Sequence, residues 1–115
     1  MATRDEFLRL VWDDVINSPM RGYWIDNVIR SAENNPNEPF GDIGPVVKRL
    51  LSIGASREDL CRIARWASYE AAFDILYMLN DPGIDEDDFH MLHEELLSAD
   101  PSGKDGRPGS WPVQS

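Results

Sequence analysis

Hydrophobic residues recur every three or four positions along most of the chain, which is the spacing of amphipathic helices. The pattern predicts five helices, at about residues 3–17, 22–34, 45–54, 57–79 and 85–98. Thr3 and Glu6 form the capping-box pattern at the first helix start. Gly54 suits the end of the third helix, and Ser56 suits the N-cap of the fourth. No stretch alternates with the period of a β-strand, so we expect an all-α fold.

The segment 57–79 is apolar on two sides. Its first apolar stripe, which we expect to receive a neighbouring helix, contains Leu60, Ala64, Ala67, Ala71, Ile75 and Met78. A second stripe contains Trp66, Phe73 and Tyr77. A helix that is apolar on two sides is usually central, so we predict one small domain over residues 1–98, packed around 57–79.

Residues 99–115 are rich in glycine and proline. This composition predicts an irregular tail, and Trp111 is the residue that would dock the tail on the body of the protein.

Composition limits the possible functions. The chain has 115 residues and a net charge of −10, from 21 acidic and 11 basic residues. This charge argues against binding to nucleic acid or to anionic membranes, which both require a cationic face. The longest apolar run, residues 75–79, is too short to span a membrane, and we expect a cytoplasmic protein. The single cysteine, Cys61, excludes an internal disulfide and a cysteine-based zinc finger, and we expect no cofactor.

The acidic residues are concentrated in one region. Residues 81–100 contain eight acids and neither lysine nor arginine. The densest part of this region consists of Asp85, Glu86, Asp87 and Asp88. One interpretation is a docking face that attracts a basic protein. The other is a helix start that favours acids because of the helix dipole and that keeps the protein soluble.

Two pairs of residues are candidates for chemistry. His90 and His93 lie three residues apart near Glu94, and imidazole with carboxylate is an acceptable metal-ligand set; the alternative is a pair of exposed histidines on an acidic helix. Glu70 and Asp74 lie four residues apart on the central helix and could share a proton as a general acid–base pair. The alternative is that each pairs with an arginine of another helix, such as Arg30 or Arg49.

Phe40 and Trp111 are aromatic residues flanked by proline or glycine in expected loops. Exposed aromatic residues of this kind serve as anchors in protein interfaces, although either could instead pack against the domain. Residues 6–11 (EFLRLV) resemble the first helix of the small acidic immunity proteins that neutralise nuclease bacteriocins. The chain lacks the Tyr-Tyr-Pro recognition segment of that family, so the likeness supplies only a hypothesis.

The leading hypothesis is a small acidic protein-binding module, in its most concrete form an inhibitor or immunity-type protein that engages a basic partner. The first alternative is a metal-dependent or carboxylate-based enzyme, built on His90 with His93 or on Glu70 with Asp74. The second alternative is a structural homodimer that closes an apolar stripe of the first or the fourth helix.

Overall fold

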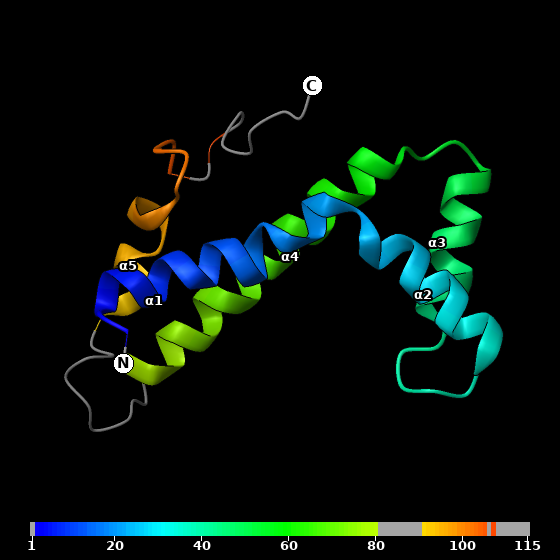
Figure 1. The fold of residues 1–115 in the computed structure, drawn as a ribbon, viewed down its shortest axis with the longest axis horizontal. Coiled ribbons are helices and arrows are strands. Elements are labelled where there is room, and N and C mark those ends of the chain that lie inside the picture. Colours follow the sequence, from blue (N-terminus) through cyan, green and yellow to red (C-terminus); the bar gives the residue numbers. More distant parts are fainter. Residues whose placement is uncertain (1, 81–90, 106, 108–115) are drawn as a thin grey trace. The chain divides into compact units, whose positions relative to one another are not determined.

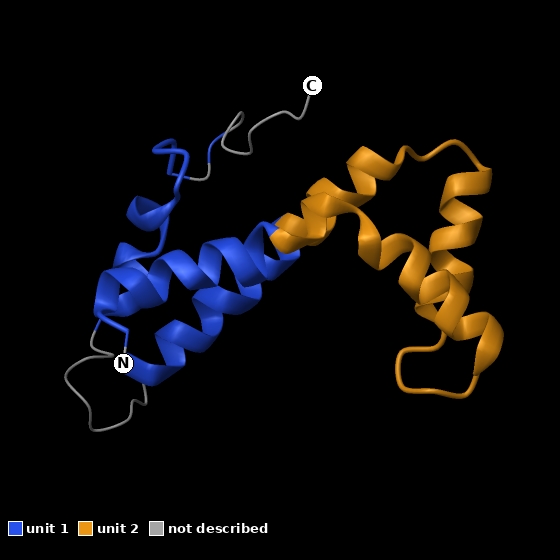
Figure 2. Cartoon of the chain, viewed as in Figure 1, with its two compact units in different colours: residues 1–17, 66–115 blue, residues 18–65 orange. Residues whose placement is uncertain are grey.

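The computed structural model describes residues 2–80, 91–105 and 107 of the chain (Figure 1). These residues are mainly helical and contain no β-strand, which confirms the expected all-α fold. The chain divides into two compact units (Figure 2). Unit 1 contains residues 1–17 and 66–115, and unit 2 contains residues 18–65.

Unit 1 begins with a helix that changes its winding. Helix α1 (Arg4–Leu10) is capped by Thr3, whose hydroxyl accepts a hydrogen bond from the Glu6 N–H and donates one to the Glu6 carboxylate. The chain continues as a π-helical segment, η1 (Val11–Ile16). The Asn17 N–H then donates to the carbonyl of Trp12, five residues earlier, at 2.8 Å. The helical segment ends there, as the following Ser-Pro pair predicts.

The core of unit 1 joins this N-terminal segment to the second half of α4 (Arg57–Met78) and to the short helices α5 (Leu92–Glu95) and η5 (Leu97–Ala99). Its buried residues are Leu8, Trp12, Ile16, Ala72, Leu76, Leu92 and Leu96. The indole Nε1 of Trp12 donates to the carbonyl of Leu96 at 2.7 Å within this core. The hydrogen bond fixes the segment after α5 onto η1, because both of its groups are buried and have no access to water.

Unit 2 contains the short 3₁₀ helix η2 (Ser18–Arg21), α2 (Tyr23–Asn34), α3 (Ile43–Ser52) and the first part of α4. Gly54 ends α3 as the sequence predicts, with a left-handed φ of 111°. The Ala55 N–H donates to the Leu50 carbonyl at 3.0 Å and the Gly54 N–H to the Leu51 carbonyl at 3.2 Å, which is the Schellman arrangement. Ser56 caps α4 as expected by accepting from the Asp59 N–H at 3.0 Å.

The core of unit 2 consists of Ile25, Val47, Leu60 and Cys61, with partly buried residues around them. Helices α2 and α3 approach each other closely at Gly44. A Cβ atom at this position would lie 2.5 Å from the Cβ of Ala32 and 2.5 Å from the carbonyl oxygen of Val28. Only glycine fits this crossing without displacement of a helix backbone.

Helix α4 contributes to both cores, Leu60 and Cys61 to one and Ala72 and Leu76 to the other. It is therefore a central helix, as expected, but Cys61, Ala72 and Leu76 belong to neither of its two predicted stripes. The expectation that the whole first stripe receives a neighbouring helix is wrong for the second half of α4. Ala67, Ala71, Ile75 and Met78 are exposed there. The reason is that unit 1 packs on the side of Ala72 and Leu76, and one helix cannot bury opposite sides against the same neighbours.

The expected continuous helix over residues 85–98 is also wrong. Met91 has a φ of 57°, which a right-handed helix cannot include. The Met91 N–H donates instead to the side-chain oxygen of Asn80 at 3.3 Å. Helix α5 starts at the next residue, Leu92, and residues 81–90 lie outside the described part of the chain.

Candidate functional site

Phe40 projects from the loop between α2 and α3. Its side chain is 84% exposed, the highest value among the exposed large hydrophobic residues of the described chain. Its φ is 61°, in the left-handed region that bulky side chains rarely adopt. Phe40 therefore has a strained backbone and a large apolar side chain in water, and it is not part of the core of unit 2.

The loop around Phe40 is fixed by short-range hydrogen bonds. The Glu38 N–H donates to Asn35 O at 3.1 Å, and the Gly41 N–H donates to Glu38 O at 2.9 Å. The Ile43 N–H donates to the Phe40 carbonyl at 3.1 Å, at the start of α3. The Glu38 carboxylate also accepts a hydrogen bond from the Ser31 hydroxyl of α2. These bonds hold the loop, and with it the position of Phe40, relative to both helices.

The surroundings of Phe40 are acidic. Residues 33–42 include Glu33, Glu38 and Asp42 and contain no lysine or arginine. Lys48 lies 3.8 Å from Glu33, and both side chains are mostly exposed. Exposed ion pairs of this kind contribute little to the stability of the fold. The loop therefore combines an aromatic residue with negative charge, a combination that suits an apolar pocket with a basic rim.

Several residues singled out in the sequence lie outside the described part of the chain. These residues are Asp85, Glu86, Asp87, Asp88, His90 and Trp111. The acidic docking face and the second aromatic anchor therefore stay predictions.

His93 is not the exposed histidine that the acidic helix suggests. It is 9% exposed and packs edge-on against two rings, at centroid distances of 5.4 Å from Phe73 and 4.9 Å from Tyr77. Its Nδ1 is buried and has no hydrogen-bond partner among the described residues. Glu94, the next residue, is exposed. Among the described residues, no three side chains of histidine, cysteine, aspartate or glutamate converge on a possible metal position.

Glu70 and Asp74 lie on an exposed side of α4. Neither forms an ion pair with the described residues of its own unit. Burial raises the pKa of Tyr69 above its ordinary value of 10.0, and the neighbouring Glu70 carboxylate adds a smaller increase. Trp66, one turn before Glu70, is 63% exposed. No described residue buries the two carboxylates, and burial is the usual means of preparing such a pair for acid–base chemistry.

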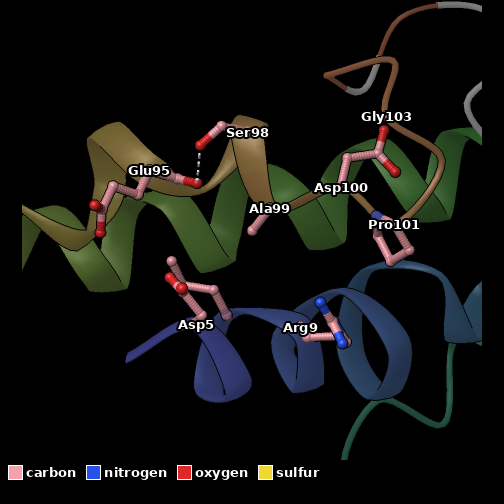
Figure 3. A pocket seen from close by; sticks show the side chains of 9 residues that line it. Asp5, Arg9, Glu95, Ser98, Ala99, Asp100, Pro101 and Gly103 are labelled. Atoms are coloured by element: carbon pink, nitrogen blue, oxygen red, sulfur yellow. Dashed lines mark hydrogen bonds between the residues drawn. The ribbon is translucent and has the colours of Figure 1, made fainter. Parts of the chain in front are cut away.

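An open pocket of about 370 Å³ lies between α1 and the segment that follows α5 (Figure 3). Asp5 and Arg9 line it from α1, and Glu95 and Asp100 line it from the other side. Glu95 pairs with Arg4 of α1, whereas Arg9 forms no ion pair with the described residues. The sequence gives no signal for this pocket, because its two sides come from segments 91 positions apart at the Arg4–Glu95 pair.

Within the described residues, no helix is both long enough and apolar enough to cross a membrane. Comparisons with known proteins identify no relative: no family model, no curated protein and no solved structure matches the chain.

Proposed function

We propose that this chain is a small acidic protein-binding module that acts in the cytoplasm and engages a basic partner. The observation that carries the proposal is the exposure of Phe40 at a strained position in a hydrogen-bonded loop. Strain of about 1–3 kcal/mol at a non-glycine residue persists only where the surrounding structure holds the conformation, and such residues cluster at functional sites. A rigid aromatic anchor loses little conformational entropy on binding, which is why such residues dominate interface energetics.

The charge of the chain supports the choice of partner. The net charge is −10, and the loop that presents Phe40 is itself acidic. Complementary charge accelerates association and disfavours acidic competitors. The most concrete form of the proposal is an inhibitor or immunity-type protein that covers the basic face of a toxin or nuclease. Residues 85–88 would add to the attraction, and Trp111 would supply a second anchor.

The proposal is tested by photo-cross-linking in the cells that make the protein. A photoreactive phenylalanine analogue is placed at position 40 and, as a control, at position 23. Tyr23 belongs to the same unit and is also strongly exposed, at 72%, but it lies in a regular helix. The proposal predicts an adduct with one basic protein from position 40 and none from position 23. Equal adducts from both positions, or no adduct from position 40, would refute it.

A further inference from the structure

The second half of α4 has a side that no described part of unit 1 covers. Ala72 and Leu76 of this half point into the core, whereas Trp66 and Met78 are 63% and 61% exposed. We call the exposed side the α4 outer face; it consists of Trp66, Ala67, Glu70, Ala71, Asp74 and Met78. At 1.5 Å per residue the face, from residue 66 to residue 78, is about 18 Å long, which is roughly three turns of helix. It is large enough for a helix of a partner protein.

The charges on the α4 outer face are all negative. Residues 66–80 include Glu70 and Asp74 but no lysine or arginine. Some acids of the chain have a basic partner: Glu58 pairs with Arg62 on the same helix at 2.5 Å, and Glu95 pairs with Arg4. Two like charges four residues apart destabilise a helix by about 0.2–0.5 kcal/mol. A cation from another molecule would remove this repulsion.

We propose that the α4 outer face binds a basic amphipathic helix of a partner protein. Lysine or arginine residues four positions apart on that helix would face Glu70 and Asp74, since the two helices have the same repeat. Ala67 and Ala71 leave room for close approach, and Trp66 offers a ring face to a cation. The inference rests on the proposed role of the chain as a protein-binding module, but its surface is separate from the Phe40 loop.

A second copy of the chain fits this face less well. A symmetric pairing would place the same patch of one copy on that of the other. Glu70 and Asp74 of both copies would then share one interface, and the face contains no base to neutralise the four carboxylates. Like charges brought together in this way cost several kcal/mol, so the occupant of the face is a basic helix and not another copy.

The test uses the full chain and a synthetic helical peptide of about 18 residues, with lysines four positions apart beside a row of leucines. Calorimetry measures its affinity for the wild type, for the double variant E70Q/D74N and for W66A. The matched control is D13N/D14N, which removes the same charge from exposed positions of η1 in the same unit. We expect E70Q/D74N and W66A to bind the peptide at least about tenfold more weakly than the wild type does. The affinity of the control should change less than about twofold.

Three results would overturn the inference. The first is no binding of the peptide to the wild type, and the second is an equal loss of affinity in D13N/D14N, which would indicate non-specific attraction to an acidic protein. The third is a dimer in sedimentation that W66A dissociates, which would make a second copy the occupant. F40A is expected to leave the peptide affinity unchanged, so failure of the Phe40 anchor and failure of the α4 outer face are distinguished.

Discussion

Replacing Phe40 by glycine and by alanine separates the strain in the loop from the contribution of the ring. About a sixth of the side chain is shielded from water, roughly 30 Å² of the ~200 Å² that a phenylalanine offers. At about 25 cal/mol per Å², its removal costs the fold about 0.8 kcal/mol. Both substitutions incur this loss. Only glycine relieves the left-handed backbone, which costs an L-residue about 1–2 kcal/mol.

Glycine also has a cost, because its unfolded chain has about 0.5–1 kcal/mol more conformational entropy to lose. The net expectation is that Phe40→Gly is more stable than Phe40→Ala by about 0.5–1 kcal/mol and close to the wild type. With a urea dependence of roughly 1–3 kcal/mol per molar, the two midpoints should differ by about 0.5 M. Both variants should lose most of the affinity for the partner, because both lack the ring.

The control is Arg30, an exposed residue inside α2. The Arg30→Gly variant is expected to be less stable than Arg30→Ala by about 1 kcal/mol, as in any regular helix. The order of the two substitutions should therefore reverse between positions 40 and 30. If Phe40→Gly is no more stable than Phe40→Ala, the backbone at position 40 is not strained, and the argument from the loop geometry fails.

Three further predictions concern packing and ionisation within the individual units. Gly44→Ala should lower the stability of unit 2 by about 1–3 kcal/mol, because the new Cβ meets Ala32 and the Val28 backbone at 2.5 Å; an unchanged urea midpoint would contradict the close crossing of α2 and α3. Trp12→Phe should cost about 1–3 kcal/mol, since the buried Leu96 carbonyl loses its donor; calorimetric melting measures it, and a melting temperature equal to that of the wild type would refute the bond. The raised pKa of Tyr69 means that the folded state holds the phenolic proton more tightly than the unfolded state does. The protonated phenol therefore stabilises the fold, fully below pH 10.0, and this stabilisation is lost as the pH rises through the folded pKa. Urea unfolding on either side of pH 10.0 should show this loss in the wild type and a smaller one in Tyr69→Phe, and equal losses would contradict it.

Local signals in the sequence predict most of the helices. The spacing of apolar residues identifies α2 and α4, and the caps at Thr3, Gly54 and Ser56 mark helix ends that the structure confirms. These signals suffice because each helix end depends on residues within one turn of it. The break at Met91 has no such signal. Methionine is a good helix former, and the left-handed conformation goes with a hydrogen bond to Asn80, a residue 11 positions earlier.

The candidate sites depend on tertiary packing, and the sequence indicates them less well. An exposed Phe40 is one of two alternatives that a proline–glycine context allows, and only the structure shows which one holds. The pattern of α4 identifies two apolar sides, whereas the side covered in unit 1, that of Ala72 and Leu76, lies between them. His93 lies on an acidic segment, yet it is buried because Phe73 and Tyr77 of α4 pack against it. Periodicity describes one element at a time, whereas burial depends on the neighbouring elements.

The most direct test of the central claim is native mass spectrometry of the protein recovered gently from the cells that make it. The account predicts a complex well above 13.1 kDa that contains a second, basic chain, and it predicts that Phe40→Ala reduces the amount of this complex. A mass of 13.1 kDa alone, or a mass twice that of the chain, would contradict the proposal of a binding module with a basic partner.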